Sequence, residues 1–242
     1  MKRQALLFLS SVLVVAGCGS GSSAPISPGT RQFDITLQNL TSTESNSGQP
    51  FSPPVFVAHD GATRLWQLGG VASLGIQNIA ETGNRTEAIN TLRPLVGASV
   101  LSLEAPLSSP LQPGKSVTVR VSVNSAHPYL SHAWMLERTN DAFGGQDSVN
   151  LFEQTGTKSY ELLGLDAGTE INSERRGTLG SLGGGNTRDP ESEKIRLHEG
   201  ITGRSDAPLS WNWKRGTIPA NQTPVARVTI TPAPNEDSGS AR

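Results

Sequence analysis

The stretch "SVTVRVSV", residues 116–123, decides the fold class of this chain. Valines occupy its odd-numbered positions, whereas polar residues, among them Arg120, occupy the even-numbered ones. Successive side chains of a strand point to opposite faces, so the valines share one face and the polar residues share the other. This pattern is typical of a strand that packs one face on a core and leaves the other face in water.

Further segments have the pattern or the composition of strands. Alternation is clear in "FDITLQNL" (33–40) and "VARVTITP" (225–232). Strand-like runs bounded by turn residues are "PPVFVAHD" (53–60), "YLSHAWMLE" (129–137) and "KSYELLGL" (158–165). Region 71–95 instead has apolar residues at helical spacing, in two pieces that Gly83 separates and Pro94 ends. The sequence therefore predicts an all-β antiparallel β-sandwich with a short helical insert.

The N-terminus has the features of a bacterial lipoprotein signal peptide. Lys2 and Arg3 precede an apolar stretch that ends in "VAGC", residues 15–18, which matches a lipobox. Cys18 is the only cysteine, so an intramolecular disulfide is excluded. We expect residues 1–17 to be removed and Cys18 to carry a lipid anchor, with Gly19 favouring the outer membrane. The alternative is an ordinary signal peptide with a free cysteine.

The rest of the chain is expected to form one domain. Residues 18–31 have the Gly/Ser/Pro composition of a tether, residues 32–231 form the sandwich, and residues 232–242 form a polar tail. The aperiodic stretch 173–196 predicts a mobile loop, either functional or simply disordered. The formal net charge of −1 and the lack of Lys/Arg runs argue against nucleic acid as a partner.

Motifs of enzymes are weak or missing. There is no G-x-S-x-G nucleophile elbow, and "QPGKS" (112–116) lacks the first glycine of a phosphate loop. The histidines do not have the spacing of a zinc site. The pairs His59-Asp60 and His198-Glu199 leave a metal-assisted hydrolase as the least favoured alternative. We therefore expect a protein that is not an enzyme.

Two acidic segments are candidates for a cation site. They are "TNDAFGGQDS" (139–148) and "DAGTE" (166–170). Neither has the register of an EF-hand loop, so a Ca²⁺ site with its six to eight oxygen ligands would have to be assembled from separate loops. Asp141 and Asp166 follow neighbouring predicted strands and would meet at one rim, with glycines turning backbone carbonyls inward. The alternative is that both segments are solvated turns.

Five ordered blocks carry a resemblance to a known family: "FSPPVFVAHDG", "WMLERTNDAFGGQDSVNL", "LDAGTEIN", "HEGITG" and "PVARVTI". Together, over about residues 33–231, they resemble the spondin N-terminal domain family of extracellular matrix and bacterial secreted proteins. The resemblance implies a C2-like β-sandwich with a calcium ion at one end.

Residue by residue, the resemblance implies Asp141, Asp166 and Glu170 as metal ligands. Glu170 stands where the family has aspartate, and Asn140 and Asp147 are weaker candidates. Trp211 and Trp213, in a long segment before the last strand, are either core or binding residues.

The expected function combines these features. We expect a module anchored to the membrane through Cys18 that binds Ca²⁺ and acts in binding or adhesion at the cell envelope. Its partner would be an extracellular or periplasmic protein or a glycan. The alternatives are a structural envelope lipoprotein whose cation only stabilises the fold, and the hydrolase.

Overall fold

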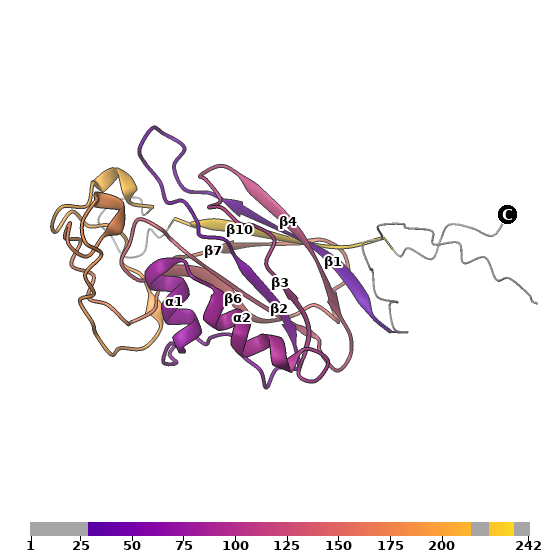
Figure 1. Cartoon of the computed structure of the whole chain (residues 1–242). Coiled ribbons are helices and arrows are strands. Elements are labelled where there is room, and N and C mark those ends of the chain that lie inside the picture. Colours follow the sequence, from indigo (N-terminus) through magenta and orange to yellow (C-terminus); the bar gives the residue numbers. More distant parts are fainter. Residues whose placement is uncertain (1–28, 214–222, 235–242) are drawn as a thin grey trace, which may run out of the picture.

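The computed structural model describes residues 29–213 and 223–234, which form two antiparallel sheets packed face to face (Figure 1). The predicted signal peptide, Cys18, most of the predicted tether and residues 235–242 of the predicted tail lie outside these residues. The four-stranded sheet has the order β4 (Ser116–Val123), β1 (Arg31–Asn39), β10 (Ala226–Pro232), β7 (Lys158–Leu162). The six-stranded sheet has the order β3 (Val100–Glu104), β2 (Val55–His59), β5 (Tyr129–Met135), β6 (Ala142–Asn150), β8 (Leu165–Asp166), β9 (Arg196–Leu197).

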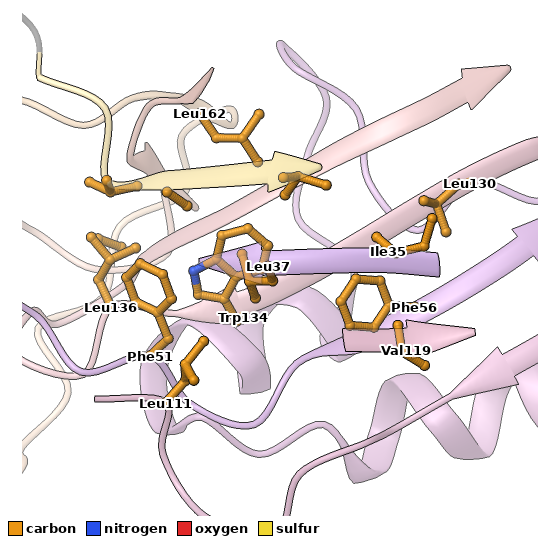
Figure 2. Close-up of a cluster of buried hydrophobic side chains, with 14 of the residues drawn as sticks. Ile35, Leu37, Phe51, Phe56, Leu111, Val119, Leu130, Trp134, Leu136 and Leu162 are labelled. Atoms are coloured by element: carbon orange, nitrogen blue, oxygen red, sulfur yellow. The ribbon is translucent and has the colours of Figure 1, made fainter. Parts of the chain in front are cut away.

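The four-stranded sheet has the two unlike faces that its sequence predicts. Ile35 of β1 pairs with Val119 of β4 on one side and with Ile230 of β10 on the other, and all three are buried. Figure 2 shows this apolar face packing on side chains of the opposite sheet. On the outer face, the hydroxyls of Thr36 and Thr118 lie 2.8 Å apart. The prediction of a half-buried sheet is therefore confirmed.

The six-stranded sheet is covered on both faces. Its outer face packs on the helical insert, which consists of α1 (Leu74–Thr82), α2 (Thr86–Leu92) and the 3₁₀ turn η1 (Arg93–Leu95). In β2, Phe56 belongs to the core between the sheets, whereas Val55 and Val57 belong to a second core under the helices. A strand buried on both faces needs apolar residues at every position, which explains why β2 lacks polar alternation. None of the helices in the described part of the chain has the length and apolar composition needed to cross a lipid bilayer.

The expectation that residues 139–148 form a loop is wrong from Ala142 onward, because strand β6 begins there. The glycine pair serves packing. A Cβ on Gly144 would lie 2.7 Å from the Trp134 ring, and one on Gly145 would lie 2.1 Å from the His132 carbonyl oxygen. Only glycine leaves room for such close approach. These two glycines are strand residues, and they do not turn carbonyls toward the rim.

The expectation of a structureless stretch at 173–196 is also corrected. The segment is irregular, but it contains the 3₁₀ turn η2 (Gly180–Leu182) and leads into β9. Leu179 and Ile195 are both 1 % exposed, the first in the core between the sheets and the second in the core under the helices. Beyond it, a third 3₁₀ turn, η3 (Leu209–Trp211), carries Trp211, which packs in the core between the sheets together with Trp213. The two tryptophans are thus core residues.

The sandwich has two distinct ends. Phe33, near the start of β1, pairs with Pro232 at the end of β10, so both terminal strands begin or finish at the same end. The irregular segments between β8 and β10 gather at the opposite end (Figure 1). The start of the first strand and the irregular loops therefore lie at opposite ends of the domain.

A buried histidine in the core between the sheets gives the first testable prediction. The His132 ring is fully buried, stacks on Trp134 with ring centroids 5.3 Å apart, and lies 3.1 Å from the Gln146 amide oxygen. Burial lowers the pKa of His132 from 6.5 to about 4. The unfolded state therefore binds more protons between these values, and the free energy of unfolding should fall by about 3 kcal/mol as the pH drops from 6.5 to 4.

The check is urea unfolding across this pH range, with His132→Phe as the comparison. Carboxyl groups also titrate in this window, but they contribute equally to both proteins. The difference in stability between wild type and variant should therefore shift with pH by the amount expected of His132. A difference that stays constant would show that this residue is not buried in its neutral form.

Candidate metal centre

Strand pairing brings the two predicted aspartates together. Asp141 lies in the turn between β5 and β6, just before β6 begins, and Asp166 ends β8. β6 and β8 run antiparallel with Ala142 opposite Asp166, and the Ala167 amide donates to the Asp141 carbonyl at 3.1 Å. Both side chains therefore lie at the loop-rich end of the sandwich.

The two carboxylates share a buried cluster with a histidine. Ligand atoms of Asp141, Asp166 and His198 all lie within 4.8 Å of one another, and the three residues are 0 %, 1 % and 2 % exposed. Carboxylates so close together repel each other in the low dielectric of an interior. Such a cluster favours either a bound proton or a bound cation.

One oxygen of Asp141 is fully engaged and the other is not. The Oδ2 atom accepts hydrogen bonds from the amides of Thr169 (2.8 Å) and Glu170 (3.0 Å) and from the Thr169 hydroxyl (3.3 Å). The Oδ1 atom is buried and has no hydrogen-bond partner among the described residues. Burial and the neighbouring Asp166 carboxylate raise the pKa of Asp141 to about 7.

Asp166 is held from several sides. Its Oδ1 atom accepts from the Gly168 amide at 2.7 Å, and its Oδ2 atom accepts from the Asn172 side-chain amide at 2.8 Å and lies 3.1 Å from the Arg196 guanidinium. Burial raises the pKa of Asp166, and these donors and the Arg196 charge oppose the rise. Gly168 has a φ of 70°, which lets the loop fold back over the carboxylate.

His198 acts as a positioning residue for this cluster. Its Nδ1 atom accepts from the Gly200 amide at 2.8 Å, so the proton is assigned to Nε2, which donates to the Asn172 amide oxygen at 3.0 Å. Asn172 in turn donates to Asp166. The cluster therefore offers oxygen atoms to a ligand, because the His198 lone pair is used by Gly200. The neighbouring Glu199 is paired with Arg204 and does not orient His198.

The third predicted ligand lies beside the aspartate pair. Glu170 is 4 % exposed, and its carboxylate lies 3.7 Å from Arg188, which also holds Glu81 at 2.8 Å. Burial and the charges of Glu81 and Asp141 raise the pKa of Glu170 to about 7, against the effect of Arg188. Glu170 is thus close enough to feel the charge of Asp141 but is not one of the three residues whose ligand atoms gather.

The two weaker candidates have other partners. Asn140 donates its side-chain amide to the Ile171 carbonyl at 2.9 Å, which joins the turn before β6 to the loop after β8. Asp147 lies within β6 and pairs with Arg64 at 2.7 Å. Asn140 therefore supports the cluster indirectly, and Asp147 belongs to a separate polar group.

The His59-Asp60 pair does not have the geometry of a base and its orienting acid. His59 is fully buried; its Nδ1 atom accepts from the Gly61 amide at 3.1 Å, so the proton lies on Nε2, 2.8 Å from the Ser131 hydroxyl. The Asp60 carboxylate instead accepts backbone amides of the turn that follows. A histidine that already carries its proton toward the serine cannot remove the proton of that hydroxyl.

Sequence reasoning missed two residues of the cluster's support, Asn172 and Arg196. Asn172 is the last residue of the "LDAGTEIN" block, 6 residues beyond Asp166, whereas Arg196 lies 30 residues beyond it and outside the quoted blocks. The fold places both side chains beside the carboxylate. The sequence marks His198 only as half of the candidate hydrolase pair His198-Glu199. The "HEGITG" block that contains it was the available signal.

Two antiparallel sheets with an acidic cluster among the loops at one end define a β-sandwich module. The profile of the Spondin_N family matches residues 43–174, more than half of the chain, and the chain therefore belongs to the spondin N-terminal domain family. The matched region is shorter than the 33–231 expected, but it contains Asp141, Asp166 and Glu170. This family is not known as an enzyme family. No match to a curated protein was found.

Proposed function

We propose that this protein is a calcium-binding module that acts in binding or adhesion at the cell envelope. The observation that carries the proposal is the Oδ1 atom of Asp141, a buried carboxylate oxygen with no hydrogen-bond partner among the described residues. Leaving such an acceptor unpaired costs free energy, and the nearby Asp166 carboxylate adds repulsion. A cation between the two carboxylates would remove both costs.

The chemistry of the donor atoms favours a hard cation. Asp141 and Asp166 would hold the ion, and Glu170 would supply the third carboxylate. Oxygen-only sets suit Ca²⁺ and Mg²⁺, whereas Zn²⁺ and Cu²⁺ favour histidine or cysteine ligands. The proton of His198 points to Asn172, which supports an oxygen-only set. The irregular loops around the cluster favour Ca²⁺, because Mg²⁺ demands a stricter octahedral geometry.

The bound cation would order the loop end of the sandwich. It would join the turn at 139–141 to the loop at 166–172, the two segments that supply its ligands. With Cys18 lipid-anchored in the outer membrane, β1 would begin at the membrane-proximal end, and the acidic cluster lies at the opposite end (Figure 1). The ordered loops would then face a protein or glycan partner in the envelope.

The test is thermal unfolding in EGTA, in excess Ca²⁺ and in excess Mg²⁺. Calcium should raise the unfolding midpoint by about 5–10 °C, because a ligand at a hundred times its Kd stabilises by about 2.7 kcal/mol. Mg²⁺ should have a much smaller effect. Asp166→Asn should lose the response to Ca²⁺, since it removes one of the two closest charges.

The matched control is Asp34→Asn, which removes a carboxylate of the outer face that pairs with Arg120 far from the loops. This variant should keep the full calcium shift. An equal shift in Asp166→Asn and wild type would place the cation elsewhere, and no shift in wild type would make the cluster a proton-binding site only.

A further inference from the structure

Apart from the carboxylate cluster, the loop end of the sandwich contains a pocket of about 660 Å³. Its walls come from three separate parts of the chain: residues 171–173 with Arg175, then Asp189, and residues 204–205. This volume lies within the range of small-molecule sites, which is roughly 300–1,000 Å³. The pocket is therefore large enough for a sugar or a small oligosaccharide.

The pocket walls are fixed to one another by hydrogen bonds. Glu174, 4 % exposed, accepts through its carboxylate from the amides of Thr202 (2.6 Å) and Arg204 (2.9 Å). The Ile171 amide donates to the Asp189 carbonyl at 2.8 Å. A site whose walls are held together before the ligand arrives loses less conformational entropy on binding.

The two arginines of the pocket differ in their hydrogen bonds and ion pairs. Arg204 donates to the Asn172 carbonyl at 2.8 Å and pairs with Glu199. Arg175 is exposed, and its guanidinium has no hydrogen bond or ion pair within residues 29–213 and 223–234. Its five donors are therefore available to a ligand, and the planar fork of a guanidinium matches a carboxylate or a phosphate.

The remaining lining groups suit the rest of a sugar. The Asp189 carboxylate and the Ser205 hydroxyl can bond hydroxyl groups, and Ile171, 45 % exposed, offers an apolar surface to a ring face. We propose that this pocket binds an anionic saccharide, with Arg175 holding its carboxylate or phosphate group. Arg175, Asp189 and the 204–205 wall lie beyond residues 43–174, the range that the family profile matches.

This inference gives a ligand class to the proposed binding module and so rests on that proposal, but it does not require the cation. Asn172 connects the two sites, because its backbone carbonyl accepts from Arg204 while its side chain donates to Asp166. Ordering of the loops by Ca²⁺ would therefore strengthen binding in the pocket without supplying its contacts.

The experiment is isothermal titration of the full chain, in detergent, with glucuronate, glucose 6-phosphate and uncharged glucose. Each is tested in EGTA and in Ca²⁺. We expect at least one of the two anionic sugars to bind and glucose to bind much more weakly, and the stronger anion distinguishes a carboxylate source from a phosphate source. Arg175→Gln should weaken the binding about tenfold or more, because it removes a charge-assisted hydrogen-bond donor.

Arg176→Gln is the matched control, since Arg176 is an exposed neighbour whose side chain does not line the pocket. It should bind the anionic sugars as wild type does. Equal binding of glucose, equal loss in the two variants, or no binding of either anion would overturn the proposal. The calcium proposal is tested separately by the thermal shift, so a failure of either can be recognised by itself.

Discussion

Trp134→Ala is expected to lower the free energy of unfolding by about 3–5 kcal/mol, a large part of the stability of an ordinary domain. The indole is fully buried between the sheets and lies beside Phe51 (Figure 2), with the two ring centroids 5.4 Å apart. It also stacks on the His132 ring. A Cβ on Gly144 would lie 2.7 Å from this ring, so the glycine leaves room for the indole, and alanine at position 134 would leave a cavity there.

The measurement is urea unfolding of wild type and variants followed by circular dichroism. Trp134→Phe should cost well under half as much, because most of the ring remains and a buried N–H with no partner among the described residues disappears. Leu68→Ala is the control, since Leu68 is 57 % exposed and its removal should change stability by less than about 0.5 kcal/mol. A Trp134→Ala cost near that of Leu68→Ala would contradict the packing described here.

The sequence predicts well those strands that have one face in the core and the other face exposed to solvent. Residues 116–123 form β4 as expected, because the outer face of the four-stranded sheet needs polar side chains that make the alternation visible. β6 was missed because its pairing with β5 requires Gly144 and Gly145, residues that are usually read as turn signals. Its strand character is set by Trp134 and the His132 backbone, and these contacts are tertiary.

The residues of the candidate site differ in the same way, because some are placed by strand pairing and others by irregular segments. The sequence predicts that Asp141 and Asp166 meet, but the strand pairing behind that prediction is wrong. The strands expected at 129–137 and 158–165 are not neighbours, because β7 lies in the four-stranded sheet. The two aspartates meet instead because β6, which the sequence does not predict, pairs with β8. The contacts of His198, Asn172 and Arg196 depend on the irregular segments after β8, whose course no periodicity encodes. The same holds for Arg188, which draws the Glu170 carboxylate toward Glu81.

Asp141→Asn is expected to reverse the usual effect of removing a charge from a buried site. Without cations at pH 8, the variant should be more stable than wild type by about 2–4 kcal/mol, because ionising a carboxyl whose pKa is raised from 3.8 to about 7 is costly. The asparagine oxygen can still accept from the Thr169 and Glu170 amides. Its amide group then places a donor, in place of the unpaired oxygen, close to the Asp166 carboxylate.

Added Ca²⁺ and a lower pH should each reduce the stability gain of Asp141→Asn over wild type. Ca²⁺ should stabilise wild type but not Asp141→Asn, so the gap between them narrows or changes sign. In EGTA, the raised pKa of Asp141 means that folded wild type holds a proton that the unfolded chain releases at lower pH. The contribution of this proton to the free energy of unfolding is fully present below pH 3.8 and is lost as the pH rises through about 7. The two proteins should therefore converge toward pH 4. Unfolding curves at pH 4, 6 and 8, with and without Ca²⁺, measure both effects.

The control for this experiment is Asp147→Asn, which removes a carboxylate of β6 that is paired with Arg64 and does not belong to the cluster around Asp166. It should keep the calcium response and show no gain of stability in EGTA. A destabilised Asp141→Asn in EGTA would mean that the Asp141 charge is already compensated in the free protein, and the argument for a cation would lose its basis. A stabilised variant that still responds to Ca²⁺ would instead move the ion to Asp166 and Glu170 alone. Only the combination of greater stability without the ion and no response to it shows that Asp141 is kept charged and buried in order to bind.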